Sequence, residues 1–193
     1  FAAAIAATSA GLVAIVANKP HQNKVLSSLV GAHTACKYGW QASNRMALLG
    51  ASIAGYNPSG QVLLKAVYTE RTQTDSGVAS DADRAAETQY AKSYMRWSTL
   101  VTLEQRYPSN RLANDGPGLP SDVVTPKGFK ATLISLAQND WLPNGLIESM
   151  DQFKQNLRVE RSNSNCDAIT FSYSPDIVNT LRVKAGRLSI IVC

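Results

Sequence analysis

The sequence is poor in the residues that build catalytic and metal sites. Its 193 residues include only two histidines, His21 and His33, and three cysteines. A tetrahedral metal site needs four converging ligands, and nothing nearby completes the pair formed by His33 and Cys36. The sequence also lacks a phosphate-binding loop, a dinucleotide fingerprint and a Gly-x-Ser-x-Gly nucleophile elbow. We therefore predict that the protein is not an enzyme and has no catalytic residues, no metal site and no cofactor.

Runs of like charge are missing as well. The net charge of +5 would permit binding to nucleic acid or to an acidic surface. However, the sequence contains no cluster of Lys or Arg, and its basic residues are scattered among acids. A mildly basic, solvated surface explains this pattern, and nucleic acid is a possible partner without a supporting motif. The hydrophobic share of 45% is ordinary for a folded chain, which argues against extensive disorder.

The first residues carry no charge from Phe1 to Asn18, and eight of the first 17 residues are alanine. A helix through this run would be roughly 26 Å long, close to the thickness of about 30 Å of a bilayer's hydrocarbon core. Three interpretations compete: a signal-peptide remnant, a buried core helix, or an anchor held in a membrane and later packed against copies of itself. Small residues such as Thr8, Ser9 and Gly11 would let such anchors approach closely.

Beyond Pro20 the apolar residues recur at spacings of three and four, which predicts an amphipathic helix from Gln22 to Leu49. Its stripe would be formed by Val25, Leu29, Ala32, Cys36 and Trp40. Several breakers between Gly50 and Gly60 end the pattern. We therefore expect two parts: a helical segment over residues 1–50 and a globular α+β domain over residues 51–193.

Within the second part, residues 61–71 favour a strand. Ser80 followed by Asp83 resembles a capping box that opens a helix extending to Tyr107, just before Pro108. A stripe formed by Ala86, Tyr90, Tyr94, Trp97 and Val101 would face the core.

A Pro- and Gly-rich loop is expected from Ser109 to Gly128. Residues 129–137 fit either a strand or a helix, and residues 144–156 indicate a short helix. Alternation over residues 168–173 and an Ala185-Gly186 turn predict antiparallel strands at the end of the chain.

The cysteines allow two interpretations. A bridge between Cys166 and Cys193 would fasten the end of the chain to the domain, with Cys36 left as a buried thiol. A disulfide that closes a loop of this length contributes on the order of 3–4 kcal/mol to the free energy of unfolding, and its presence implies an oxidising location. Alternatively, all three are free buried thiols.

Several of these features together resemble the type IV pilins and pseudopilins. They are an N-terminal Phe, a long apolar run, the stretch PHQNKVL after it, the segment GLPSDVV, and terminal strands that carry the Cys166–Cys193 pair. The resemblance implies processing by a prepilin peptidase, methylation of Phe1 and assembly through bundled N-terminal helices. Position 5, usually glutamate in that family, is Ile5 here, which suggests a tip or minor subunit.

The expected fold is thus α+β, with a long N-terminal helix packed on a small antiparallel sheet and extra helices. The expected function is a structural subunit of an extracellular, pilus-like filament. Its partners would be copies of itself, other pilins and, before assembly, the inner membrane. The residues expected to anchor and pack it are Phe1, Ile5, Leu12, Val16 and Pro20.

Two alternatives come from other classes of protein. One is a viral or phage coat protein whose apolar N-terminus packs in a shell or filament. The other is a DNA-capturing minor pilin, for which binding would weaken steeply with salt. Its candidate contacts are Arg158, Arg161, Arg182, Lys184 and Arg187.

Overall fold

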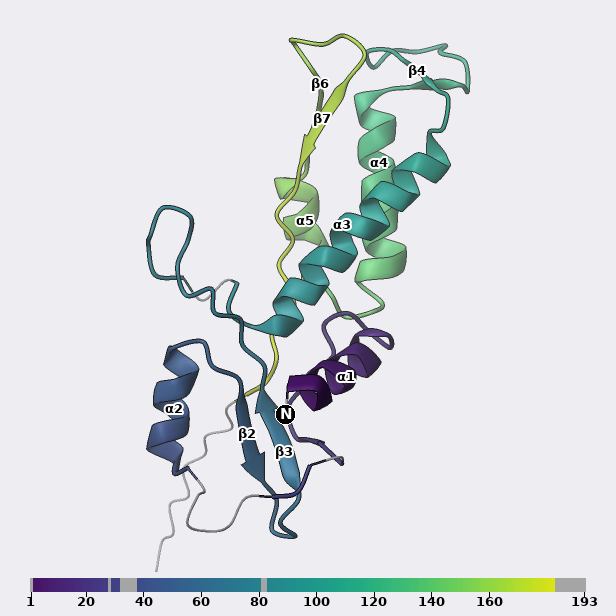
Figure 1. The fold of residues 1–193 in the computed structure, drawn as a ribbon. Helices are drawn as coiled ribbons and strands as arrows, with labels where there is room; N and C mark the ends of the chain where they lie inside the picture. Colours follow the sequence, from purple (N-terminus) through teal and green to yellow (C-terminus); the bar gives the residue numbers. More distant parts are fainter. Residues whose placement is uncertain (1, 28, 32–37, 81–82, 183–193) are drawn as a thin grey trace, which may run out of the picture.

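The computed structural model describes residues 2–27, 29–31, 38–80 and 83–182. Figure 1 shows a small sheet flanked by helices at one end of the molecule and a group of helices with a hairpin at the other. We call the first part the sheet region; it contains α1 (Ala2–Val13), β1 (Lys24–Val25), α2 (Trp40–Leu48), β2 (Ile53–Tyr56) and β3 (Val62–Ala66).

We call the second part the helical region. It begins with α3 (Ala86–Arg106) and contains two further helices, a π-helical turn and two pairs of short strands. These are β4 (Arg111–Leu112), β5 (Val123–Val124), α4 (Pro126–Leu136), η2 (Ala137–Trp141), α5 (Met150–Asn156), β6 (Arg158–Arg161) and β7 (Ile169–Ser172).

The sheet region is organised around β3. This strand lies between β1 and β2 and pairs antiparallel with both, so four of its five residues are buried. The β2–β3 turn closes through Asn57, whose side-chain oxygen accepts from the backbone N–H of Gln61 at 2.8 Å. The predicted strand over residues 61–71 is therefore confirmed for Val62–Ala66.

The long N-terminal helix predicted from the sequence is wrong. Helix α1 ends at Val13, and the amphipathic helix expected from Gln22 to Leu49 is present only as α2 (Trp40–Leu48), while β1 occupies the beginning of that range. Asn23 adopts a left-handed backbone (φ 61°), and its N–H donates to the carbonyl of Leu64 at 2.8 Å. Leu26 then donates to Val62, so pairing with β3 takes the place of helical hydrogen bonds and overrides the helical spacing of the apolar residues.

Capping residues and a proline mark ends of the helices in the helical region. Thr125 caps α4 by accepting from the N–H of Gly128 at 3.2 Å, and Ser149 caps α5 by accepting from Gln152 at 3.3 Å. Helix α3 stops before Pro108 as predicted, but it starts at Ala86 rather than at the expected capping box, with Ala85 as its N-cap.

The predicted core stripe of α3 is displaced. Its fully buried residues include Ala91, Met95 and Ser98, whereas Trp97 is 59% exposed. Trp141 of η2 is fully buried against α3, where its indole N–H donates to the hydroxyl of Ser98 at 2.9 Å. Serine on the inner face carried no apolar signal, so the hydrophobic spacing predicted the buried face only in part: Ala86 is buried and Tyr94 packs against the core.

After β7 the chain runs back towards the sheet region (Figure 1). Ile177 forms an isolated antiparallel bridge with Ile147, and Val178 donates to the carbonyl of Leu146 at 3.1 Å. The described part ends at Arg182, beside Gln22 of the N-terminal segment. The predicted hairpin around Ala185-Gly186 lies outside the described residues.

Candidate functional site

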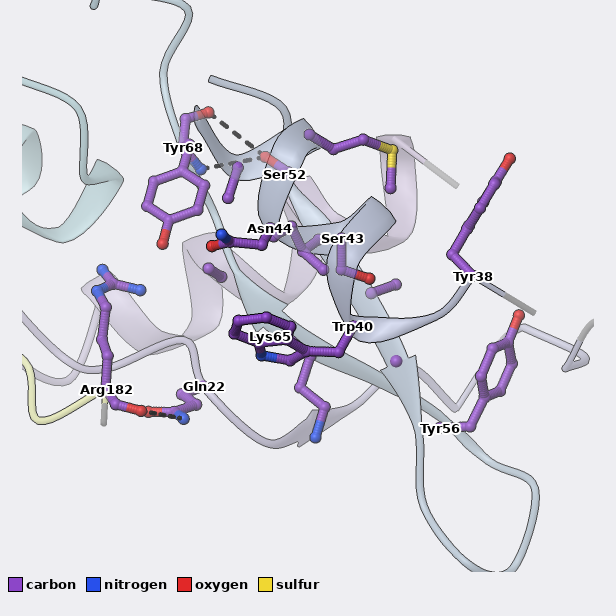
Figure 2. A pocket seen from close by; sticks show the side chains of 16 residues that line it. Gln22, Tyr38, Trp40, Ser43, Asn44, Ser52, Tyr56, Lys65, Tyr68 and Arg182 are labelled. Atoms are coloured by element: carbon purple, nitrogen blue, oxygen red, sulfur yellow. Dashed lines mark hydrogen bonds between the residues drawn. The ribbon is translucent and has the colours of Figure 1, made fainter. Parts of the chain in front are cut away.

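The sheet region contains an open hollow of about 730 Å³ between α2 and the sheet. Figure 2 shows aromatic side chains from several elements around it, with Arg182 and Gln22 at one side. The side chains that matter below are those of Tyr38, Trp40, Tyr56, Lys65, Tyr68 and Arg182. The hollow exists because α2 covers the sheet incompletely: among its nine residues, only Ala47 is buried.

Helix α2 is short and weakly fixed at its start, since Gly39 at its N-cap offers no side-chain oxygen. Its end is fixed more firmly, because Gly50 has a φ of +82° and an added Cβ would come within 2.7 Å of the carbonyl oxygen of Thr69. Opposite α2, the stem of Lys65 crosses over Gly55, where a Cβ would meet its Cε at 2.6 Å. The missing side chain at Gly55 thus lets Lys65 lie across β2 at the hollow.

Large apolar side chains gather on α2 and beside it without being buried. Tyr38 is 74% exposed, Trp40 78%, Leu48 61% and Leu49 79%. Single exposed apolar residues are common on proteins, but several within one short stretch mark a contact surface. Trp and Tyr are also the residue types that most often dominate the energy of protein contacts. We call Tyr38, Trp40, Arg45, Leu48, Leu49 and Lys65 the α2 surface.

The same stretch of chain has an extreme charge pattern. Residues 1–69 contain five Lys or Arg and no Asp or Glu, and Glu70 is the first acid in the sequence. The remaining residues contain 14 of each sign, so the whole net charge of +5 comes from the first 69 residues. The sequence-based prediction of evenly scattered charge missed this asymmetry, although counting acids along the chain reveals it.

A buried ionic cluster joins the two regions. Glu87, in the first turn of α3, lies 3.3 Å from Nδ1 of His21 and accepts from the guanidinium of Arg182 at 2.9 Å. Burial alone would raise the pKa of Glu87, but the hydrogen bond from His21 and the charge of Arg182 outweigh it and lower the pKa to about 2. The Arg182 guanidinium also lies over the ring of Tyr68, 5.3 Å from its centroid. This cluster fixes the N-terminal segment, α3 and the returning chain to one another.

A second, polar hollow of about 970 Å³ lies in the helical region where α3 and α4 approach the β4–β5 loop. At its rim the hydroxyl of Tyr94 donates to the carboxylate of Asp140 at 3.0 Å. Burial and this carboxylate raise the pKa of Tyr94. The lining offers no nucleophile paired with a base. Within the described ranges, no three residues among His, Cys, Asp and Glu gather to hold a metal ion.

Three of the five residues predicted to anchor and pack the protein, Ile5, Leu12 and Val16, pack within the chain. Leu12 is buried, Ile5 packs against the core of the sheet region, and Val16 packs against the core of the helical region. Pro20 is exposed and Phe1 lies outside the described residues. Helix α1 and the turn after it therefore connect the two cores. None of the helices in the described part of the chain has both the length and the apolar character needed to cross a membrane.

The other predicted sites are only partly described. Cys166 is exposed, while Cys36 and Cys193 lie outside the described residues, so the disulfide stays a prediction. Of the basic residues proposed for DNA capture, the three that the structure describes do not form one cluster. Arg158 and Arg161 are on β6, whereas Arg182 is paired with Glu87 near the sheet region. Lys184 and Arg187 are outside the described residues.

Comparison with known proteins points away from pili. No family model matches the sequence. The tail sheath protein of the Mu-like prophage FluMu from Haemophilus influenzae is 29% identical over 196 aligned residues, which cover 100% of this chain. The chain spans 39% of the length of that relative.

A solved structure shares the fold. It is a chain in the cryo-EM structure of the anti-feeding prophage baseplate, symmetrised 6-fold, with a TM-score of 0.65 and 11% sequence identity. The match covers 97% of this chain and 49% of that chain. At this identity the likeness establishes the fold and no more.

These findings overturn the resemblance to type IV pilins. The full-length similarity is to a tail sheath protein, and the fold is one found in a prophage baseplate. The pilin partners and the membrane anchoring expected with that resemblance are corrected with it. The apolar N-terminus misled because alanine-rich helices occur in membranes and in protein cores alike. Here α1 packs on the core of the sheet region through Ile5, and Val16 and Ala17 in the turn after it pack on the core of the helical region. The extracellular location and the absence of catalysis stay predictions.

Proposed function

We propose that this chain is part of a structural subunit of a phage-tail-like particle, of the tail sheath type, present in many copies. The observation that carries the proposal is the similarity to a tail sheath protein along the entire chain. The shared fold with a chain of a 6-fold symmetrised baseplate supports the same kind of assembly. At the coarser level, a structural subunit of viral origin agrees with the coat-protein alternative drawn from the sequence.

The surface of the protein fits a structural role better than a catalytic one. Exposed aromatic and aliphatic side chains occur on α2 and directly beside it, and others such as Trp97 and Leu100 lie on α3, so apolar surface is available for contact with other subunits. Neither hollow combines a nucleophile, a base and a group able to stabilise an anion. We therefore infer that the protein acts through assembly and carries no enzymatic activity.

The test is to locate the protein in particles. Tail-like particles would be purified from the producing cells and labelled with gold-conjugated antibody against this chain. Quantitative mass spectrometry would give the number of copies of the chain per particle. We expect label along the length of the tail and many copies per particle. Label confined to one end would replace the sheath assignment with a baseplate component. Absence of the protein from particles would overturn both.

A further inference from the structure

The α2 surface has the composition of an interface that is still unoccupied. Trp40 and Leu49 are 78% and 79% exposed, so they contribute little to the fold of their own chain. Interfaces typically centre on aromatic anchors surrounded by charged residues. Here the anchors are Tyr38 and Trp40, and the charges are Arg45 on α2 and Lys65 in the hollow beside it.

The charge of this surface restricts its partner. Four described cations belong to the first 69 residues, namely Lys19, Lys24, Arg45 and Lys65, and none forms an ion pair with a described residue. The six residues of the α2 surface include two cations and no acid, and the exposed Glu70 lies beside Gly50 at its edge. Two copies of this surface with their cations facing each other would repel. A symmetric contact between identical patches is thus unfavourable, and the complementary partner is acidic.

The chain itself carries such a partner. Glu148, Asp151 and Asp176 are all exposed, and none forms an ion pair within the described ranges. They lie close together, because the N–H of Glu148 donates to the backbone carbonyl of Asp176 at 2.9 Å and Asp151 opens α5 three residues later. We call these three residues the acidic patch.

We infer that the α2 surface of one copy binds the acidic patch of the next copy. This inference rests on the proposed function, because it names the contact between subunits of the assembly. A contact between two different patches is heterologous, and repetition of it closes into a ring or continues as a helix. Both outcomes suit a subunit that surrounds a tail.

Substitutions that reverse the charge of either patch test the contact between the α2 surface and the acidic patch. One variant carries Arg45→Glu and Lys65→Glu, and a second carries Glu148→Lys and Asp151→Lys. A matched control carries Arg106→Glu and Lys127→Glu, two exposed cations outside both patches. Assembly of the intact protein would be followed by sedimentation velocity and electron microscopy. We expect each patch variant alone to need about tenfold more protein to assemble, the effect of roughly 1.4 kcal/mol per contact, while the control behaves as the wild type.

Mixing the two patch variants gives the decisive result. The now acidic α2 surface of the first variant can bind the now basic patch of the second variant. The unaltered α2 surface of the second variant can bind the unaltered acidic patch of the first. The mixture should therefore assemble with the two variants alternating. Recovery in the mixture also shows that both variants are folded. Patch variants that assemble like the wild type, or a mixture without recovery, would overturn the contact. The proposed function would survive that result, because it is tested separately by locating the wild-type protein in particles.

Discussion

The helical region and the sheet region differ in the size of the core that each encloses. In the described part of the helical region, α3, η2 and α5 enclose a large core that contains Trp141, Phe153 and Met95, all at most 1% exposed. The core of the sheet region contains Leu26, Val62 and Leu64, while larger side chains on α2 stay in solvent. The comparison suggests that the helical region provides most of the stability of the chain, although it too exposes apolar side chains such as Trp97 and Leu100.

Charge separates the regions in the same way. Acids and bases balance in residues 70–193, where several form ion pairs such as Lys92 with Asp83. Residues 1–69 have cations only. Unbalanced charge weakens a compact state through self-repulsion, so a region that retains it gains little stability and instead attracts an oppositely charged surface.

The largest expected effect is the loss of the aromatic centre of the helical region. Trp141→Ala should lower the free energy of unfolding by about 3–5 kcal/mol, because it leaves a cavity where a fully buried indole packs 5.6 Å from the ring of Phe153. It also removes the donor to the hydroxyl of Ser98. Urea unfolding followed by circular dichroism measures the change. A loss under about 1 kcal/mol would show that this core is not the main source of stability.

A matched pair of leucines sharpens the comparison. Leu64 in β3 and Leu133 in α4 are both fully buried. We expect Leu133→Ala to cost about 3–4 kcal/mol and Leu64→Ala about 2–3 kcal/mol, because the thinner sheet region can relax more around the cavity. Hydrogen exchange should place the effect of Leu64→Ala on the amides of Asn23 and Leu26, which donate to β3. Equal costs and a shared exchange pattern would mean that the two regions unfold as one unit.

The sequence predicted the helical region better than the sheet region. Breakers located helix ends better than the expected capping box located a start: Pro108 follows the end of α3, which begins at Ala86 and not at Ser80, and the second half of the helix expected over residues 144–156 appears as α5. These signals are local, acting through hydrogen bonds within a few residues. The undecided segment over residues 129–137 became part of α4 and η2, where Thr125 supplied the cap.

The structure of the sheet region was not predicted correctly, because the hydrogen bonds that determine it join residues far apart in the sequence. The helical spacing of Val25, Leu29 and Trp40 is present, but Asn23 turns the backbone and β3, some 40 residues away, supplies the hydrogen bonds. The candidate interface was missed for another reason. Its signal is an absence, the lack of any acid before Glu70, and motif searches look for residues that are present.

The buried ionic cluster gives an intermediate effect that depends on pH. The pKa of Glu87 falls from 4.5 to about 2 on folding, so the charged form stabilises the protein above the higher value. This contribution of about 3 kcal/mol is lost as the pH drops through the range between the two values. Glu87→Gln should therefore be less stable than the wild type near neutral pH, with the difference shrinking in acid. A pH-independent difference in urea unfolding would contradict the assignment.

The smallest expected effect on folding belongs to the α2 surface. Leu49 is 79% exposed, so Leu49→Ser should change the free energy of unfolding by less than about 0.5 kcal/mol, whereas Leu26→Ser, at a residue 2% exposed, should destabilise the sheet region strongly. The same Leu49→Ser variant should still weaken assembly, because the leucine lies on the surface inferred to contact the next copy. Thermal unfolding at a concentration below assembly, compared with sedimentation above it, separates the two effects. A clear loss of stability in the unassembled protein would mean that Leu49 supports its own chain, and that the sheet region is less different from the helical region than its exposed residues indicate.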